Sequence, residues 1–198
     1  MPTGVALRDP RRQLFDAAER VLLRDGANAL TSRAVTTEAG CAKGVLHRHF
    51  ADFDAFLAEL VAERAAETER QAGLLLAAAG TGTVVGNLTR ALVEVFSSVT
   101  VAVVGLVIAR DELRARLREQ AGGRRGLPLV TETAAMIAGY LEAERGLGRI
   151  AADADIRTLA PTLVGAAHLR FADREADPAE AEDVRRSVRA VVGGVLTQ

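Results

Sequence analysis

Apolar residues near the start of the chain recur at the spacing of one face of an α-helix. From about Arg11 to Asp25, polar residues lie mostly off a stripe made of Leu14, Ala18, Val21 and Leu22. Gly26 follows directly and is suited to end a helix, because glycine readily adopts the backbone angles of a helix C-terminus. The pattern predicts a first helix over about residues 11–25.

Two short helices are predicted next. The first follows Thr31 or Ser32, either of which can cap it, and stops at Gly40. The second covers about Lys43 to His49. Small or apolar residues supply the inner faces of the pair: Ala34, Val35 and Ala39 for the first helix, and Cys41, Leu46 and Phe50 for the second.

The rest of the pattern is helical as well. Asp52 can cap a long helix that reaches about Ala79, before glycines at 80 and 82. Further helices are predicted at about 83–98, 99–118, 127–145 and 153–171, where Pro161 should kink the helix or mark a restart. A final helix opens on a capping pattern made of Asp177, Pro178 and Glu180. No strand pattern or hairpin turn appears, so we predict an all-α fold.

Composition narrows the class of protein. Of 198 residues, 49% are hydrophobic and 26% are charged, which excludes a disordered chain. The longest uncharged apolar run, Val99 to Ala109, has 11 residues and is too short to span a bilayer. The N-terminus lacks the pattern of a secretory signal. Cys41, the single cysteine, cannot form an internal disulfide, so we expect a cytoplasmic protein with no membrane partner.

The formal net charge of −1 hides an uneven distribution. Residues 1–50 hold eight Lys and Arg against five Asp and Glu, a balance of +3, and the remainder holds 17 against 21, a balance of −4. Lys43 is the only lysine among the 25 basic residues. The positive end is where a polyanion would bind, and a solvated charged face is the alternative interpretation.

The two short helices have the composition of a helix-turn-helix. This motif needs small or apolar residues where the helices cross, a glycine at the turn, and polar or small outward residues on the second helix. We expect that second helix to lie in the DNA major groove, where Lys43 donates to guanine and Val45 touches a thymine methyl. The candidate DNA-contacting residues are Thr31, Ser32, Arg33, Ala42, Lys43, Gly44, Val45, His47, Arg48 and His49. A basic arm made of Arg8, Arg11 and Arg12 is either a further DNA contact or a solvated terminus.

Residues 11–57 resemble the DNA-binding domain of the tetracycline-repressor (TetR) family of bacterial regulators. The resemblance rests on the double alanine in the first helix, the glycine before the capping threonine, Ala-Gly at the turn, the Gly-x-Leu that follows, and His-Phe before the long helix. Three positions depart from the family pattern: Ala42 replaces the usual Ser or Thr, His47 the usual Tyr, and Phe53 the usual Lys.

The resemblance implies a DNA-binding domain at residues 1–51 and a ligand-binding and dimerisation domain at residues 52–198. It implies an unknown small-molecule effector, apolar or amphipathic, held by apolar helices with a few polar groups. The candidate pocket residues are Phe96, Thr100, Val103, Val107, Thr133, Met136, Ile137, Tyr140, Leu163, His168 and Phe171. Ordinary core packing is the alternative for each of them.

The last two helices are the predicted dimer interface. Gly165, Ala166 and Ala167 permit close approach, and Val184, Val188, Val191 and Val195 recur at a 4-3-4 spacing that is typical of a helix-packing seam. A two-fold dimer would place two recognition helices on successive major grooves of an inverted-repeat operator. The alternative is that the seam closes a bundle within one chain.

No zinc-protease, CxxC, GxGxxG or P-loop motif appears, and we expect neither an enzyme nor a metal or cofactor site. The sequence therefore predicts a homodimeric regulator that binds double-stranded operator DNA and is a repressor released by its ligand. A ligand- or partner-binding helical protein whose DNA reader has decayed is the alternative, supported by Ala42, His47 and Phe53.

Overall fold

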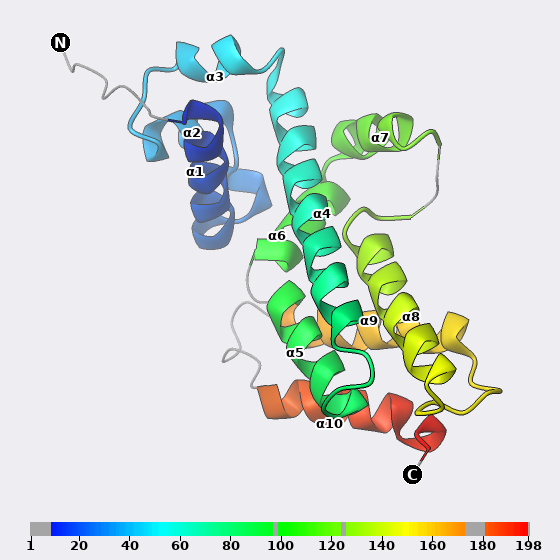
Figure 1. Cartoon of the computed structure of the whole chain (residues 1–198). Helices are drawn as coiled ribbons and strands as arrows, with labels where there is room; N and C mark the ends of the chain where they lie inside the picture. Colours follow the sequence, from blue (N-terminus) through cyan, green and yellow to red (C-terminus); the bar gives the residue numbers. More distant parts are fainter. Residues whose placement is uncertain (1–8, 97–98, 124–125, 173–180, 198) are drawn as a thin grey trace. The chain divides into compact units, whose positions relative to one another are not determined.

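A computed structural model describes residues 9–96, 99–123, 126–172 and 181–197 of the chain (Figure 1). These residues form α-helices, two short 3₁₀ turns and connecting loops, with one isolated bridge between Ile150 and Leu196 and no strand. The all-α prediction is confirmed. The helices are α1 Pro10–Asp25, α2 Ser32–Glu38, α3 Gly44–His49, α4 Phe53–Ala77, α5 Val84–Phe96, α6 Val99–Ala109, α7 Asp111–Gln120, α8 Val130–Gly146, α9 Ile156–Ala172 and α10 Ala181–Val192.

The chain divides into two compact units. One comprises Met1–Glu63 with Ala102–Arg125, and the other comprises Arg64–Val101 with Gly126–Gln198. The long helix α4 contributes residues to both. The predicted domain boundary between residues 51 and 52 stays a prediction, because the two units are defined by their compactness and not by their function.

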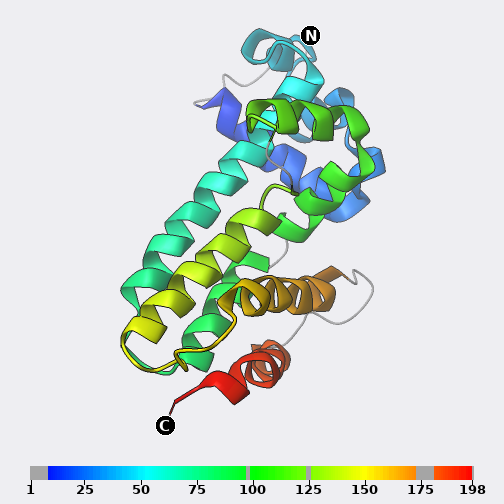
Figure 2. The same cartoon turned by 90° about the vertical axis from the view of Figure 1, so that its right-hand side faces the viewer.

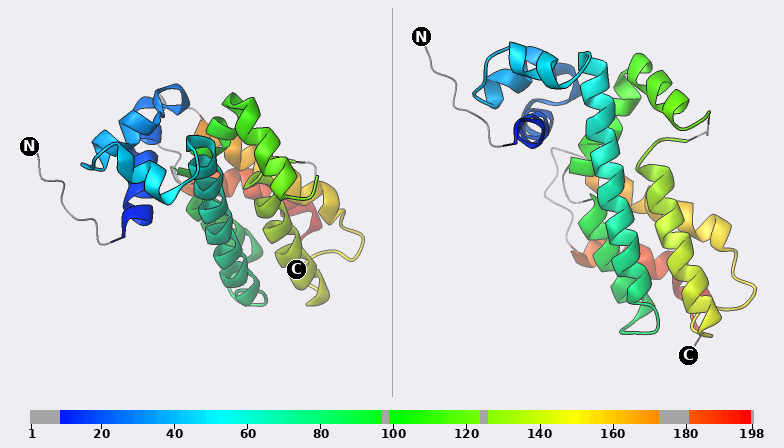
Figure 3. Two further views of the ribbon diagram at one scale, coloured as in Figure 1. Left: turned by 90° about the horizontal axis from the view of Figure 1, so that it is seen from above. Right: turned by 45° about the horizontal axis from the view of Figure 1, so that its top comes forward.

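Helices α1, α2 and α3 form one group in the first unit, with α1 seen nearly end-on in the right-hand view of Figure 3. Asp9 caps α1 by accepting from the Arg12 backbone N–H at 3.1 Å, and Gly26 ends it at φ 84°. The apolar stripe of α1 is buried as predicted. Phe15, Phe50 and Phe56 pack together with ring centroids 5.0–5.6 Å apart, joining α1, the end of α3 and α4.

The predicted helix over residues 99–118 is two helices in the structure, so this prediction is wrong. Arg110 has extended backbone angles between α6 and α7. Its guanidinium donates to the Leu30 carbonyl at 2.5 Å and lies over the Phe53 ring, 5.6 Å from the centroid. These contacts with distant residues hold Arg110 outside the helix, and Asp111 and Glu112 favour a new helix N-terminus.

Helix α8 begins at Val130, later than predicted. Leu129 precedes it with φ 70°, a left-handed conformation that is rare for leucine, and its side chain is fully buried. Burial of this side chain offsets the cost of the backbone conformation. The capping pattern at residues 177–180 lies outside the described residues.

The second unit has one apolar core built by α5, α8, α9 and α10. Helix α10 packs against α5 and α9, and α8 packs against α9. Helices α9 and α10 run across the direction of α5 and α8 (Figures 1 and 2). Pro161 is exposed and marks no restart, since α9 continues through it. The carbonyl that loses its partner there belongs to exposed Arg157, which water can reach.

The valine seam, made by three valines of α10 and by Val195 in the 3₁₀ turn after it, packs against this core. Val184 and Val188 are 1% and 0% exposed, and Val191 and Val195 pack against the same cluster. Val184 and Val188 are therefore not accessible to a second copy, and these two valines close a helical bundle within one chain. Among the described residues, no single helix is both long and apolar enough to cross a membrane; α5 and α6 pass that test only as a bent pair, on length and composition.

Candidate nucleic-acid interface and ligand grooves

Helix α2 and the turn after it are held by local hydrogen bonds. Thr31, not Ser32, is the cap: its Oγ1 accepts from the Ala34 backbone N–H at 3.1 Å. At the C-terminal end, Gly40 adopts φ 65°, and the N–H groups of Gly40 and Cys41 donate to carbonyls of the last turn at 3.1 and 3.0 Å. Such a turn favours glycine at its left-handed position. It joins α2 to α3 as a helix-turn-helix requires.

Helix α3 faces the core with one side only. Leu46 is fully buried and Phe50 is 3% exposed, as the predicted inner face requires. Lys43 stands at the cap position without a side-chain cap bond, and Ala42 has no side-chain oxygen that can replace it. The departure at Ala42 therefore leaves the start of α3 without a capping side chain.

The candidate DNA-contacting residues lie on or near the surface of this motif. Exposed residues are Thr31, Arg33, Ala42, Lys43, Gly44, His47 and Arg48, and partly exposed ones are Ser32, Val45 and His49. Within the described part of the chain, Arg33, Lys43 and Arg48 form no ion pair with a carboxylate. Three unneutralised cations on one helix-turn-helix favour a polyanion.

Two arginines of α1 in the same unit, in contrast, are neutralised by ion pairs. Arg20 and Arg24 of α1 donate to Glu38 of α2 at 2.8 and 2.9 Å and lower the pKa of that carboxyl. Arg24 also pairs with Asp25 at 2.8 Å. These ion pairs brace α1 against α2 and leave little charge for a ligand.

Arg11 is tied to the motif and does not belong to a free arm. It donates to the His49 carbonyl at 3.1 Å, pairs with Glu59 of α4, and lies over the Phe50 ring at 4.5 Å from the centroid. Arg11 therefore positions the end of α3. Of the other arm residues, Arg12 is exposed and Arg8 lies outside the described residues.

Asp52 connects α4 to α7. It caps α4 by accepting from the Ala55 backbone N–H at 2.5 Å, as predicted, and its two oxygens accept from Arg116 at 2.7 and 3.0 Å. These hydrogen bonds lower the pKa of Asp52 to about 2, and the one from Arg116 has the largest effect. Phe53, where the resembled family has Lys, stacks on Phe56 and supports Arg110.

The predicted ligand residues do not gather around one cavity. Phe96, Ile137 and Leu163 belong to the closed core of the second unit, and Thr133 is fully buried with its hydroxyl donating to the Leu129 carbonyl at 2.5 Å. Val103 and Val107 belong to the other compact unit. His168 and Phe171 pack against Phe96, with ring centroids 6.0 and 6.2 Å away. Core packing accounts for these positions.

Three of the predicted residues reach surface hollows. Met136 and Tyr140 line a groove of about 370 Å³ between α4 and α8, with Glu69 and Glu132 among its other lining residues. Thr100 lines a smaller hollow of about 260 Å³. The first groove is mostly apolar and carries two carboxylates.

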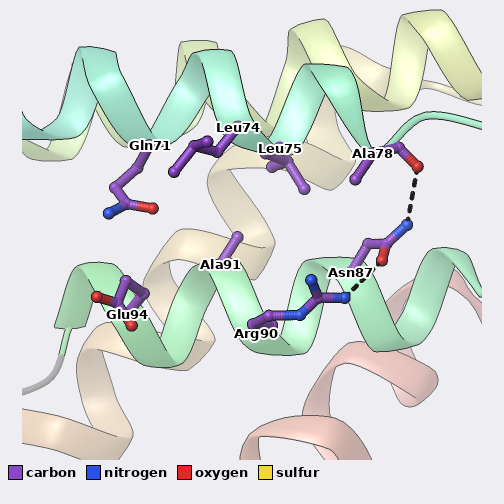
Figure 4. Close-up of a pocket in the computed structure, with 8 residues that line it drawn as sticks. All are labelled: Gln71, Leu74, Leu75, Ala78, Asn87, Arg90, Ala91 and Glu94. Carbon is purple, nitrogen blue, oxygen red and sulfur yellow. Dashed lines mark hydrogen bonds between the residues drawn. The ribbon is translucent and has the colours of Figure 1, made fainter. Parts of the chain in front are cut away.

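The sequence did not predict a further groove, which the structure shows. It lies between α4 and α5, has a volume of about 380 Å³, and is lined by Gln71, Leu74, Leu75, Ala78, Asn87, Arg90, Ala91 and Glu94 (Figure 4). Its polar residues have the spacing of an ordinary amphipathic helix surface. The only available signal was an asparagine on the apolar side of α5, where it is 4% exposed.

A buried hydrogen-bond network lies behind this groove. The Asn87 amide donates to the Tyr140 hydroxyl at 3.0 Å, and that hydroxyl donates to Glu144, which is fully buried and pairs with Arg149 at 3.3 Å. Burial raises the pKa of Tyr140, and the hydrogen bond to the Glu144 carboxylate raises it further. Tyr140 therefore stays a donor across the ordinary pH range.

The histidine, cysteine and carboxylate side chains of the described residues are dispersed. No group of three or more His, Cys, Asp or Glu side chains there is placed to hold a metal ion. Cys41 is partly buried, and burial raises the pKa of its thiol. A raised pKa lowers the thiolate fraction on which cysteine reactivity depends.

Comparisons with known proteins agree with the geometry of the first unit. Residues 14–60 match the family described as bacterial regulatory proteins, tetR family. A comparison with curated proteins finds no match. The fold is similar to the FadR regulator of Bacillus subtilis solved with stearoyl-CoA (18% identity, TM-score 0.68, covering 93% of this chain and 98% of that one). It is also similar to the reduced form of Escherichia coli NemR (16% identity, TM-score 0.72, covering 96% and 98%).

Proposed function

We propose that this chain, whose residues 14–60 match the tetR family of bacterial regulatory proteins, is a cytoplasmic, homodimeric transcriptional repressor. In this proposal it binds an inverted-repeat operator and leaves it when a small apolar or amphipathic ligand binds the second unit. The observation that carries the DNA-binding part is the exposed group of Arg33, Lys43 and Arg48, none of which pairs with a described carboxylate.

The DNA contacts divide into two kinds. Lys43 and Val45, at the start of α3, are assigned to base edges, because a lysine can donate to guanine and an apolar side chain can contact a thymine methyl. Arg33, Arg48 and His49 are assigned to phosphates, together with Thr31, Ser32 and His47. Exposed Gly44 and Ala42 allow a close approach of the groove wall.

The proposed dimer surface is the exposed stripe of α9. Pro161, Gly165 and Leu169 are exposed and follow each other at four-residue spacing, so they lie on one face. Leu169 is 76% exposed, so the stripe carries an apolar side chain that a partner would remove from water. Gly165 has open space around its α-carbon, which permits close helix approach, and Ala166 lies beside it.

Ligand binding is proposed for the grooves along α4. The fold-similar Bacillus subtilis protein was solved with stearoyl-CoA, and another protein of this fold is described as a γ-butyrolactone receptor. Both grooves lie in the second unit and combine apolar surface with a few polar side chains, the usual lining of a small-molecule site.

The DNA-binding part is tested by fluorescence anisotropy of the purified protein. The probe is duplex DNA from upstream of its own gene, at two salt concentrations, beside scrambled DNA of equal length. We expect tight, salt-sensitive and sequence-selective binding. A random-sequence selection covers the case of a distant operator, and failure of both experiments would favour the decayed reader.

A further inference from the structure

The groove between α4 and α5 has an apolar side formed by the long helix. Leu74 and Leu75 of α4, and Ala78 directly after it, face Ala91 of α5 across the groove (Figure 4). Leu74 is 65% exposed, so the groove holds apolar surface that water contacts. An apolar chain that covers this surface would gain free energy by removing it from water.

Asn87 has a fixed orientation at one end of this groove. Its amide nitrogen faces three acceptors that share its two N–H groups: the carbonyls of Ala78 and Thr81, at 3.2 and 2.9 Å, and the Tyr140 hydroxyl oxygen, at 3.0 Å. Backbone carbonyls only accept, so the nitrogen must face them and the amide oxygen must point the other way. That oxygen accepts from Arg90 at 2.9 Å.

Arg90 is therefore oriented by a buried residue while its own side chain is exposed. Its single side-chain hydrogen bond in the described structure is the one to Asn87, and it pairs with no described carboxylate. A guanidinium has five N–H donors, and its planar edge suits the two oxygens of a carboxylate. Most of the donors of Arg90 are available to a ligand.

We propose that this groove binds a small amphipathic carboxylate, with its aliphatic chain over Leu74, Leu75 and Ala78 and its carboxylate on Arg90. A volume of about 380 Å³ suits a chain of medium length. Asn87 and Arg90 lie one turn or more from Glu94 along α5, so the carboxylate is assigned to the Asn87 end of the groove. The role of this carboxylate as effector rests on the proposed function, whereas its binding does not.

Tyr140 provides a direct readout of binding. It is the only tyrosine, and the chain has no tryptophan, so the intrinsic fluorescence comes from this one residue. Its hydroxyl accepts from Asn87, the residue that orients Arg90. A carboxylate on Arg90 should therefore change the Tyr140 signal.

The test titrates the full-length protein, without DNA, with three probes that share a ten-carbon chain: decanoate, 1-decanol and decyltrimethylammonium. Tyrosine fluorescence and calorimetry give the dissociation constants. We expect decanoate to bind about tenfold more tightly than decanol, the usual scale of a charge-assisted hydrogen bond. Arg90→Gln should remove that advantage, and Arg157→Gln, an exposed arginine on α9, should leave it unchanged.

A second variant checks the apolar half of the site. Leu74→Gln should weaken decanoate and decanol alike, because both chains lose the same contact. Equal affinities of decanoate and decanol, a decanoate affinity that Arg90→Gln leaves unchanged, or tightest binding of decyltrimethylammonium would each overturn the proposal. Anisotropy on operator DNA, run separately, shows whether DNA binding itself fails, and its result does not alter the groove titration.

Discussion

Lys43 differs from the paired arginines of the first unit by what surrounds it. Arg11, Arg20 and Arg24 are held by carboxylates, whereas Lys43 is exposed at the start of α3 and pairs with none in the described structure. Gly44 and Val45 follow it and present little bulk. At the scale of single residues, this combination is suited to reading bases.

We predict that Lys43→Ala relaxes sequence preference. A lost contact to guanine should reduce the discrimination between operator and mismatched DNA by about 1–3 kcal/mol. Arg33→Ala, the comparison variant, should weaken all sequences evenly and reduce the salt slope by about one. Anisotropy on matched and mismatched duplexes measures both, and an even loss for Lys43→Ala would remove its assignment to bases.

Asp52 makes a pH-dependent contribution to stability. Its pKa is lowered to about 2 in the folded chain from an ordinary value of 3.8, so the charged form stabilises the fold. This contribution is complete above about pH 4 and is lost as the pH falls toward 2. We predict that Asp52→Asn flattens the pH dependence of the unfolding temperature in this window. An unchanged profile between pH 2 and 4 would mean that the Arg116 pair contributes nothing there.

At the scale of elements, the helix-turn-helix depends on a few caps because its helices are short. Helix α2 has seven residues, and a helix of that length gains little stability from propensity alone. Thr31 satisfies one N–H at its start, and Gly40 permits the turn at its end. Helix α3 is shorter and has no capping side chain, so its packing through Leu46 and Phe50 must hold it.

We predict that Thr31→Ala lowers the free energy of unfolding by about 1 kcal/mol, the usual cost of a lost cap. Thr37→Ala is the matched control, because Thr37 is exposed on the same helix and does not cap it. Urea unfolding of both variants gives the difference. Equal effects of the two substitutions would show that the Thr31 hydroxyl adds no stability.

At the scale of the whole molecule, two copies are needed to read an inverted repeat. The valines of α10 are buried in the core of one chain, so the dimer surface that we propose is the exposed stripe of α9. We predict that Leu169→Glu makes the protein monomeric and weakens operator binding. Leu147→Glu, at a leucine that is 57% exposed after α8, should leave a dimer. Sedimentation measures the mass, and a dimeric Leu169→Glu variant would exclude this face.

Much of the first unit was determined by the sequence itself, because its signals act between near neighbours. The stripe of α1, a cap of α2 at Thr31 or Ser32, the turn at Gly40 and the Asp52 cap each involve residues a few positions apart, and the structure selects Thr31 as the cap of α2. Periodicity and capping rules describe such distances well. The resemblance of residues 11–57 to a regulator family rests on the same local motif, and the family match to residues 14–60 agrees with it.

Tertiary structure alone decided the features that join distant parts of the chain. Arg110 interrupts a helical pattern because it contacts Leu30, which lies 80 positions earlier. Periodicity marked the valines of α10 as a seam, but only packing shows that α5 and α9 cover it. Likewise, Arg90 resembles any surface arginine until Asn87, Tyr140 and the apolar edge of α4 come together around it. A sequence pattern describes one helix face, whereas burial and orientation depend on which other helix meets that face.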